Sequence, residues 1–284
     1  MQFGDYRVEI IPDAEFRLDG GAMFGVVPRN LWSRVCPPDE QNRIRLNMNC
    51  LFIEAGDDRI LIDTGIGEKW SEKHSAMYGI DRRGSLADSL QQIADVSADQ
   101  ITMVVNTHLH FDHAGGNTRV DESGQPRAAF PNARYFVSRA ELDHAEHPSE
   151  RDHASYFPAN WRPISESGQL ELKEDDYEVI PGLKMQMVRG HCRSLQCPRL
   201  TSRGRTLFGF SDIIPTRAHI PLAWIMSFDL YPTETLAAKK QLLPEAAREG
   251  WWCLFYHDAD EPLCRIVEAE RGFAAIPIAM KEQA

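Results

Sequence analysis

Apolar positions along the chain alternate between short β-prone runs and longer runs with helical spacing. The segment NCLFIEAGDDRILIDTG (49–65) predicts two strands around a Gly-Asp-Asp turn. The segment SLADSLQQIADVSADQI (85–101) predicts an amphipathic helix that is capped by Ser85. A buried strand, ITMVV (101–105), is predicted directly after this helix. Such alternation of strands and helices favours an α/β fold.

The same alternation continues toward the C-terminus. Strands are predicted at four further β-prone runs, RYFV (134–137), KMQMV (184–188), TLFGF (206–210) and WCLFY (252–256). The segment 233–250 has helical spacing, with Thr233 as a candidate cap and Gly250 as the stop signal. The polar stretch 141–170, which also holds aromatic residues, is interpreted as an insertion or a lid. Because no linker or low-complexity segment divides the chain, we predict a single domain over residues 1–284.

Composition and charge narrow the possible functions. The chain has 284 residues, of which 43% are hydrophobic, enough to bury a substantial core. A formal net charge of −11 disfavours binding to nucleic acid or to an anionic membrane. The sequence shows neither a signal peptide nor 18 consecutive apolar residues, so we expect a cytoplasmic location. The six cysteines form no CxxC motif and are predicted to be free thiols.

The segment VVNTHLHFDHAGGN (104–117) places three histidines and an aspartate within six positions. In an extended segment, residues two apart point to the same side, so His108 and His110 can direct their imidazoles to one point. Asp112 and His113 follow on the next turn and can face a second point nearby. Neutral imidazoles and carboxylates are ligands of zinc and similar divalent ions. The pattern therefore predicts a metal site more strongly than a solvated polar loop.

This cluster matches HxHxDH, the signature of the metallo-β-lactamase superfamily of metallohydrolases, which the chain resembles over about residues 45–260. Four further motifs agree with that family in order and spacing. They are LIDTG (61–65), RGHC (189–192), FSDIIPT (210–216) and FYHDAD (255–260). The resemblance implies a four-layer αββα sandwich, built from two similar halves, with metals at one edge of the two sheets.

By this resemblance, seven residues would bind two divalent ions. His108, His110 and His191 would hold the first ion, Asp112, His113 and His257 the second, and Asp212 would bridge them. Zinc is the predicted metal, although the same ligands accept iron, manganese or cobalt. Two such ions lower the pKa of a shared water from 15.7 toward roughly 7, which supplies hydroxide at neutral pH. Asp112 would also pass a proton to the leaving group.

Three other residues are considered for roles beside these ligands. Asp63 is interpreted as a carboxylate that orients a ligand imidazole or its loop, with a helix N-cap as the alternative. Cys192 is interpreted as a packed small residue rather than a redox-active or metal-perturbing thiol. Lactonases of the superfamily often carry a substrate-binding tyrosine where this chain has Pro215. His219 could replace that hydrogen-bond donor, but a solvent-exposed loop histidine is the favoured interpretation.

Departures from the family pattern disfavour several branches. Leu195 replaces the second histidine of the GHTPGH motif that many relatives carry, but His191 is kept, so the metal assignment is unchanged. Only 27 residues follow His257, which disfavours glyoxalase II-like members, because these carry a sizeable C-terminal domain for glutathione. The absence of an export signal, of a basic surface and of a glutamate at position 110 disfavours secreted β-lactamases, nucleases and oxygen-reducing relatives. What remains resembles the lactonase-like branch, which includes quorum-quenching lactonases. Its implied reaction is the opening of a lactone or small carboxylic ester by a metal-bridging hydroxide.

Two alternatives stay open. The chain could hydrolyse phosphotriesters or aryl esters with the same fold, or it could be a metal-containing ligand sensor with little turnover. Five apolar residues could line a substrate pocket, although core packing is the stronger interpretation for each; they are Phe24, Trp32, Trp224, Met226 and Phe228. The predicted partner is a small ester or lactone, with a homodimer as an open alternative and without nucleic acid or membrane.

Overall fold

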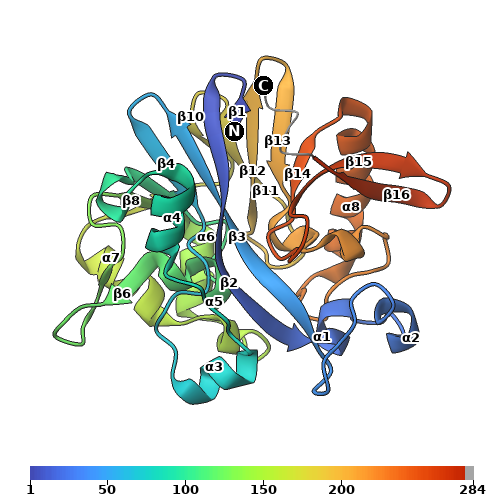
Figure 1. The fold of residues 1–284 in the computed structure, drawn as a ribbon, viewed down its shortest axis with the longest axis horizontal. Coiled ribbons are helices and arrows are strands. Elements are labelled where there is room, and N and C mark those ends of the chain that lie inside the picture. Colours follow the sequence, from blue (N-terminus) through green and yellow to red (C-terminus); the bar gives the residue numbers. More distant parts are fainter. Residues whose placement is uncertain (279–284) are drawn as a thin grey trace. The chain divides into compact units, whose positions relative to one another are not determined.

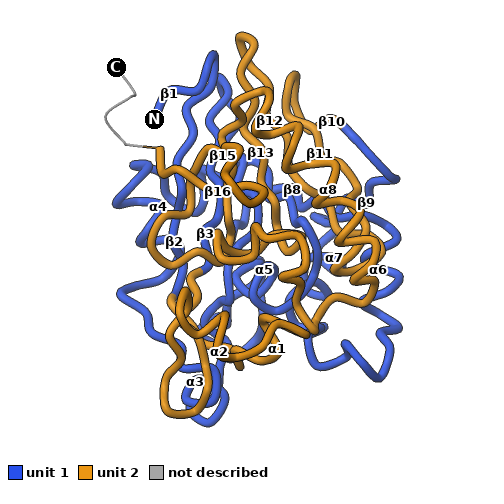
Figure 2. Tube along the Cα trace, turned by 90° about the vertical axis from the view of Figure 1, so that its right-hand side faces the viewer, with its two compact units in different colours: residues 1–14, 48–177 blue, residues 15–47, 178–284 orange. Residues whose placement is uncertain are grey.

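The computed structural model describes residues 1–278, which divide into two compact units. Unit 1 comprises Met1–Ala14 and Met48–Tyr177, and unit 2 comprises Glu15–Asn47 and the described residues from Glu178 onward. Figure 2 distinguishes the two units by colour. Helices and strands are mixed in both units, and the strands form two seven-stranded sheets and one two-stranded sheet (Figure 1). This content agrees with the predicted α/β class.

The first seven-stranded sheet has the strand order β1-β2-β3-β4-β5-β8-β9. Its strands are β1 (Gln2–Phe3), β2 (Tyr6–Asp19), β3 (Arg43–Ala55), β4 (Asp58–Ile62), β5 (Met103–Val105), β8 (Arg134–Ser138) and β9 (Leu170–Lys173). β4 pairs parallel with β5, and β5 pairs parallel with β8. The carboxyl ends of these three strands therefore lie at one edge of the sheet, the edge at which α/β proteins place their ligands.

The second sheet has the strand order β10-β11-β12-β13-β14-β15-β16. Its strands are β10 (Tyr177–Ile180), β11 (Leu183–Met187), β12 (Gln196–Ser202), β13 (Arg205–Gly209), β14 (Trp252–Leu254), β15 (Leu263–Ala269) and β16 (Gly272–Pro277). β11 and β13 both pair antiparallel with β12, and β13 pairs parallel with β14. Three strands thus run in the same direction, and the segments that follow them begin at the same edge of this sheet.

All strands predicted from the sequence are confirmed, with ends shifted by one to a few residues. The helix predicted over 85–101 is shorter: α4 spans Leu86–Ala94 and ends at Asp95, which adopts a left-handed φ of 57°. The capping role of Ser85 is confirmed, because its side chain accepts from the amide of Asp88 while the Asp88 side chain accepts from the Ser85 amide. A separate 3-10 turn, η1 (Ala98–Gln100), then leads into β5.

Part of the segment interpreted as an insertion or a lid, 141–170, packs into the core of unit 1. Its aromatic residues Tyr156 and Trp161 are buried and pack against Leu109 and Val137. Other residues of the stretch are exposed, among them Phe157, which is 36% exposed. The helices of unit 1 are α3 (Glu72–Tyr78), α4, α5 (Phe111–Ala114), α6 (Arg139–Glu146) and α7 (Arg162–Glu166). The hairpin β6 (Thr118–Val120) and β7 (Pro126–Ala128) and the 3-10 turns η2 (Gly115–Asn117), η3 (His153–Ser155) and η4 (Pro158–Asn160) complete the unit.

In unit 2, α8 (Pro232–Glu249) packs beside β15 (Figure 1). Leu243 and Ala246 of this helix join a buried cluster with Phe208 and Cys253 of the second sheet. The predicted stop at Gly250 is confirmed by its left-handed φ of 64°. The predicted cap at Thr233 is wrong, because the helix begins one residue earlier at a proline, whose fixed φ suits the first helical position. The other helical segments of this unit are α1 (Gly20–Phe24), α2 (Arg29–Trp32) and the 3-10 turns η5 (Ser211–Ile213) and η6 (Arg217–His219).

No helix within residues 1–278 combines the length and the apolar character that a bilayer-crossing segment needs. The six cysteines form no disulfide among the described residues, and five of them are buried. Cys192 is 1% exposed and packs in the apolar cluster of unit 2. Its interpretation as a packed small residue is therefore confirmed.

Candidate metal centre

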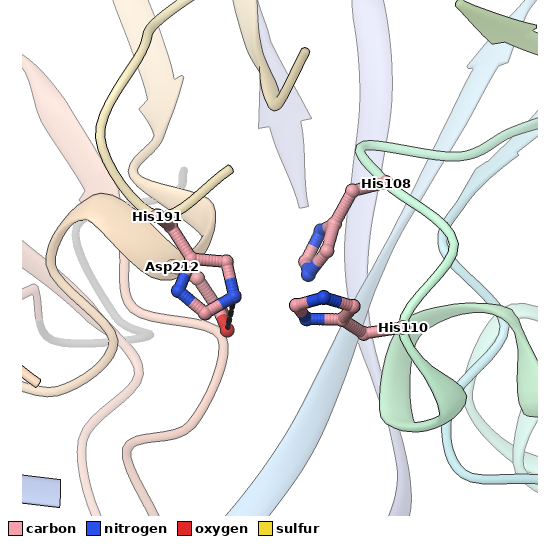
Figure 3. Close-up of side chains that lie close together, drawn as sticks. All are labelled: His108, His110, His191 and Asp212. Atoms are coloured by element: carbon pink, nitrogen blue, oxygen red, sulfur yellow. Dashed lines mark ion pairs between the residues drawn. The ribbon is translucent and has the colours of Figure 1, made fainter. Parts of the chain in front are cut away.

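The HxHxDH segment of unit 1 follows β5 at the carboxyl edge of the first sheet. His108 and His110 come before α5, and their rings lie 4.5 Å apart (Figure 3). Asp112 and His113 lie on α5 itself, and the rings of His108 and His113 are 4.1 Å apart. All four side chains are buried, with at most 7% of any residue exposed. Potential ligand atoms of His108 and His110 lie within 4.8 Å of one another, as do those of Asp112 and His113.

Asp63 follows β4 and fixes this segment from the neighbouring strand. Its Oδ1 accepts a hydrogen bond of 2.8 Å from the amide of Thr107, and its Oδ2 accepts one of 2.8 Å from the Thr107 hydroxyl. The same Oδ2 lies 2.8 Å from Nδ1 of His113. A hydrogen on that nitrogen leaves the Nε2 lone pair of His113 for a metal ion. No helix begins at Asp63, whose φ is 58°, so the structure does not place it as an N-cap.

Backbone contacts hold the loop after β4 against the ligand segment. The amide of Thr64 donates to the carbonyl of His113 over 2.8 Å. Close approach requires glycine at Gly67, where a Cβ would lie 2.2 Å from the carbonyl oxygen of Gly115 and φ is +67°. The buried Asp13 accepts two hydrogen bonds from Arg82 and one of 2.8 Å from the amide of Ile66. These contacts fix the backbone from which His113 projects.

The three candidate ligands of unit 2 follow β11, β13 and β14. Nε2 of His191 lies 3.3 Å from Oδ2 of Asp212, the pair joined by the dashed line in Figure 3. Nε2 of His257 lies 3.1 Å from Oδ1 of the same aspartate. Asp212 therefore directs one carboxylate oxygen toward each histidine. All three residues are buried, and none is more than 5% exposed.

The second ring nitrogen of each of these histidines has an acceptor. Nδ1 of His191 lies 2.9 Å from Oδ1 of Asp229, and Nδ1 of His257 lies 3.1 Å from the carbonyl oxygen of Asn47. Both acceptors favour the tautomer that carries hydrogen on Nδ1 and a lone pair on Nε2. This arrangement, buried imidazoles oriented by an outer acceptor and a carboxylate between them, is typical of ligands for a divalent metal. The donor sets of both units therefore support divalent metal binding.

Residues 44–194, more than half of the chain, match the family model of the metallo-beta-lactamase superfamily. The chain belongs to this superfamily. A probable metal-dependent hydrolase from Staphylococcus aureus has a similar structure, with 32% identity, a TM-score of 0.89 and coverage of 99% of both chains. The predicted metallo-β-lactamase fold and the predicted class, a metal-dependent hydrolase, are thereby confirmed.

Lactonases are among the relatives of this superfamily member. N-acyl homoserine lactonase AiiA of Bacillus thuringiensis subsp. kurstaki is 26% identical over 239 residues, which cover 78% of this chain and 86% of the relative. The structure of AidC, a dizinc quorum-quenching lactonase in complex with the product N-hexnoyl-L-homoserine, shares the fold. It has 23% identity, a TM-score of 0.80 and coverage of 99% of this chain and 97% of AidC.

Within this metallo-β-lactamase fold, His219 is buried rather than exposed on a loop. Only 1% of the residue is exposed. Its Nδ1 lies 2.8 Å from the Thr216 hydroxyl, its Nε2 lies 2.9 Å from the carbonyl oxygen of Met23, and its ring stacks on Phe24 at 4.5 Å. Burial lowers the pKa of His219 to about 3, so the ring is neutral at ordinary pH. The solvent interpretation is wrong because the sequence around position 219 does not reveal the distant α1 segment that covers it.

The apolar residues suggested as a pocket lining divide into two groups. Phe24, Trp32 and Met226 are buried, which confirms core packing for them. Phe24 stacks on Trp32 with ring centroids 5.3 Å apart. Trp224 is half-buried, and Phe228 is 39% exposed. Only these last two side chains are accessible to a substrate.

Glu141 lies beside the candidate ligands and is absent from the sequence-based prediction. Glu141, at the start of α6, is fully buried, and its Oε1 accepts hydrogen bonds from the Leu109 amide at 2.8 Å and the Tyr156 hydroxyl at 3.2 Å. It thus holds the backbone between His108 and His110. The signal that could have identified Glu141 is its position after β8, which lies parallel to β5.

Aromatic side chains gather beside α5 in unit 1. Phe111 contacts Trp70, Tyr78 and Phe157, with ring centroids 5.2–5.7 Å apart. Burial raises the pKa of Tyr78, and the carboxylate of Asp112 adds to the effect. An apolar surface therefore adjoins the carboxylate that the sequence analysis assigns to proton transfer.

Proposed function

We propose that this metallo-β-lactamase superfamily member hydrolyses a lactone or another small carboxylic ester with two divalent metal ions, zinc being the expected metal. The observation that carries the proposal is Asp212, which directs one oxygen toward His191 and the other toward His257. A carboxylate in that position offsets the mutual repulsion of two cations. The names of the relatives AiiA and AidC, a lactonase and a dizinc lactonase, support the substrate class and the metal.

The proposal keeps the ligand sets that the family resemblance implies. His108, His110 and His191 would hold one ion, Asp112, His113 and His257 would hold the other, and Asp212 would bind both. Bound in this way, two divalent ions lower the pKa of a shared water toward neutrality and stabilise negative charge on an attacked carbonyl oxygen. The carboxylate of Asp63 and the carbonyl of Asn47 keep the hydrogen of His113 and His257 on Nδ1.

Proton transfer is assigned to Asp112. Ester hydrolysis forms a bond from water oxygen to the carbonyl carbon and breaks the bond from that carbon to the alkoxy oxygen. An Asp112 oxygen takes the proton released by the water and delivers it to the departing alkoxide. Because Asp112 is only 6% exposed, bulk water competes little for that proton. The aromatic surface formed by Phe111 and its neighbours provides apolar contact for an acyl group.

The Asp212→Asn variant tests the proposal. An amide carries no negative charge and is a poorer bridge, so both ions should bind more weakly. We expect kcat/KM on the best substrate to fall on the order of a hundredfold or more, since the lost stabilisation amounts to several kcal/mol. A panel of lactones, aryl esters and phosphotriesters first identifies the best substrate. Steady-state hydrolysis of that substrate and metal content are then measured on the same preparations.

Asp260→Asn is the matched control, because the Asp260 side chain is 64% exposed and pairs with Arg45 at the surface. Its activity and metal content should stay close to wild type. Two retained metals and wild-type activity in Asp212→Asn would show that the bridge is assigned to the wrong residue. Preferential hydrolysis of phosphotriesters would replace the proposed substrate class, and two bound metals without turnover of any compound would favour a ligand sensor.

A cytoplasmic location and a homodimer stay predictions from the sequence. Subcellular fractionation tests the first, and light scattering of the purified protein tests the second. A lactone or ester remains the proposed small-molecule partner, without nucleic acid or membrane.

A further inference from the structure

We infer that Thr235 and Asp229 form a hydrogen-bonded relay that positions the metal ligand His191 and sets its affinity for the ion. The relay lies entirely within unit 2. The Thr235 hydroxyl donates to Oδ2 of Asp229 over 2.6 Å, and Oδ1 of the same carboxylate lies 2.9 Å from Nδ1 of His191. The inference rests on the proposed function, because it treats His191 as a metal ligand.

All three residues of the relay are buried, so the loss of a hydrogen bond between them costs free energy. Thr235 is 1% exposed, and Asp229 and His191 are 2% exposed. A buried carboxylate is stable only where hydrogen bonds replace its lost water, and here each oxygen has one such partner. Removing the hydroxyl leaves Oδ2 without this donor, so the carboxylate can rotate away from His191 to reach another. The imidazole would then lose its fixed tautomer and its fixed ring orientation.

The backbone ties the same two segments together. The amide of Leu230 donates to the carbonyl of His191 over 2.9 Å, and the amide of Tyr231 donates to that of Gly190 over 2.9 Å. A Cβ at Gly190 would lie 2.3 Å from Oγ1 of Thr235 and 2.8 Å from its Cα, so Thr235 packs directly on this glycine. The first turn of α8 is thus fixed against the ligand segment, and the relay adds the side-chain contact that orients the ring.

A similar arrangement exists in unit 1. The Thr107 hydroxyl donates to Oδ2 of Asp63 over 2.8 Å, and that oxygen lies 2.8 Å from Nδ1 of His113. Each unit therefore uses a threonine to hold an aspartate against the Nδ1 atom of one candidate ligand. The histidine and the threonine share one carboxylate oxygen of Asp63, whereas they use different oxygens of Asp229. The presence of a threonine, aspartate and histidine contact in both units favours a role in metal binding over incidental packing.

The test is Thr235→Val, which keeps the volume of the side chain and removes only the hydroxyl. Loss of one hydrogen bond to a buried charged group should weaken retention of one of the two zinc ions about tenfold in competition with a chelator. The other zinc ion should be retained nearly as in wild type, because His257 is oriented by the carbonyl of Asn47. Thr235→Ser restores the hydroxyl and should restore affinity to within about twofold.

Thr233→Val is the matched control, since Thr233 lies exposed on the same turn of α8. Asp229→Asn extends the test: it should lower the affinity of the same ion by about 10- to 100-fold, the range expected for a lost outer partner of a metal-bound histidine. The cobalt-substituted protein supplies a second measurement. We expect its visible absorption bands to shift in Thr235→Val and to return in Thr235→Ser, which a general loss of stability would not produce.

The outcomes separate this inference from the proposed function. Wild-type protein that binds no zinc would overturn both. Wild-type protein that binds two ions, together with Thr235→Val that retains both with unchanged affinity and an unchanged cobalt spectrum, would overturn the relay alone. Equal weakening in Thr235→Val and Thr235→Ser would likewise contradict it, because the hydroxyl would then have no part in the effect.

Discussion

Replacement of His219 by glutamine should make the protein less sensitive to acid. The neutral His219 ring is held between the Thr216 hydroxyl and the carbonyl of Met23, and burial lowers its pKa to about 3. In the unfolded chain a histidine titrates near pH 6.5. Below that pH the unfolded state therefore binds a proton that the folded state does not. The stabilisation is fully present above pH 6.5 and is lost as the pH falls toward about 3.

The two pKa values set the size of the effect. Between pH 7.5 and pH 5.0 the unfolded state gains ~2 kcal/mol from protonating this histidine, whereas the folded state gains almost nothing. Glutamine can still donate to the carbonyl of Met23, but it neither titrates nor stacks on Phe24. His219→Gln should be less stable than wild type at pH 7.5 by about 1–3 kcal/mol. That deficit should shrink by ~2 kcal/mol at pH 5.0.

Urea unfolding at both pH values, with the same metal content in every sample, measures this difference. His153→Gln, at an exposed histidine, is the control and is measured under the same conditions. A deficit for His219→Gln that stays constant or grows on acidification would refute the reasoning. Hydrolysis at pH 7.5 adds an independent check. If His219 binds the substrate, the His219→Gln variant should lose activity far beyond its loss of stability.

Three further predictions follow from the same structure. Gly67→Ala should cost more than about 2 kcal/mol in urea unfolding because its Cβ meets the backbone of Gly115, whereas Gly124→Ala, also at positive φ but with open space, should cost about 1 kcal/mol. Burial lowers the pKa of Lys239 to about 7. Between pH 7 and 10 the free energy of unfolding of the wild type should therefore rise by ~1.4 kcal/mol per pH unit relative to that of Lys239→Met. A difference in unfolding free energy that stays constant with pH would contradict this. If residues 1–284 form one domain, tryptophan fluorescence and circular dichroism should report one coincident unfolding transition; two separate transitions would show independent domains.

The sequence predicts best where chemistry and chain order coincide. The HxHxDH segment combines a buried strand with closely spaced ligands, and both features are local, so they can be recognised without coordinates. The strand before it, β5, is predicted for the same reason, whereas the short strand β6 after it is not. Asp63 could also be selected from the sequence because it directly follows β4 in a family motif, and the structure places its carboxylate against Nδ1 of His113.

Contacts between distant segments could not be predicted in this way. Asp229 lies 38 residues from His191, and no local pattern distinguishes it from a surface aspartate before a helix. The sequence favours a solvent-exposed His219 because the residues that bury it, Met23 and Phe24, are distant in the chain. Met23 precedes His219 by 196 residues. The segment 141–170 is interpreted as an insertion or a lid because polar residues surround its aromatic ones, yet Tyr156 and Trp161 are buried. In each case burial depends on tertiary packing, which local composition does not encode.

The partners of the histidine Nδ1 atoms bear on how strongly each of the two proposed ions would be held. A carboxylate partner makes a metal-bound imidazole a stronger donor than a carbonyl partner does, because it stabilises the positive charge that spreads onto the ring. Asp63 serves His113 and Asp229 serves His191, so each proposed ligand set contains one histidine backed by a carboxylate. The Nδ1 atom of His257 faces the carbonyl oxygen of Asn47, and the proposed set of His257 also includes the charged ligand Asp112. Exchanging the carboxylates for amides one at a time should therefore unbalance the two affinities in opposite directions, Asp63→Asn weakening the ion bound by His113 and Asp229→Asn the ion bound by His191. Equal weakening of both ions in each variant would show that the two sites respond as one.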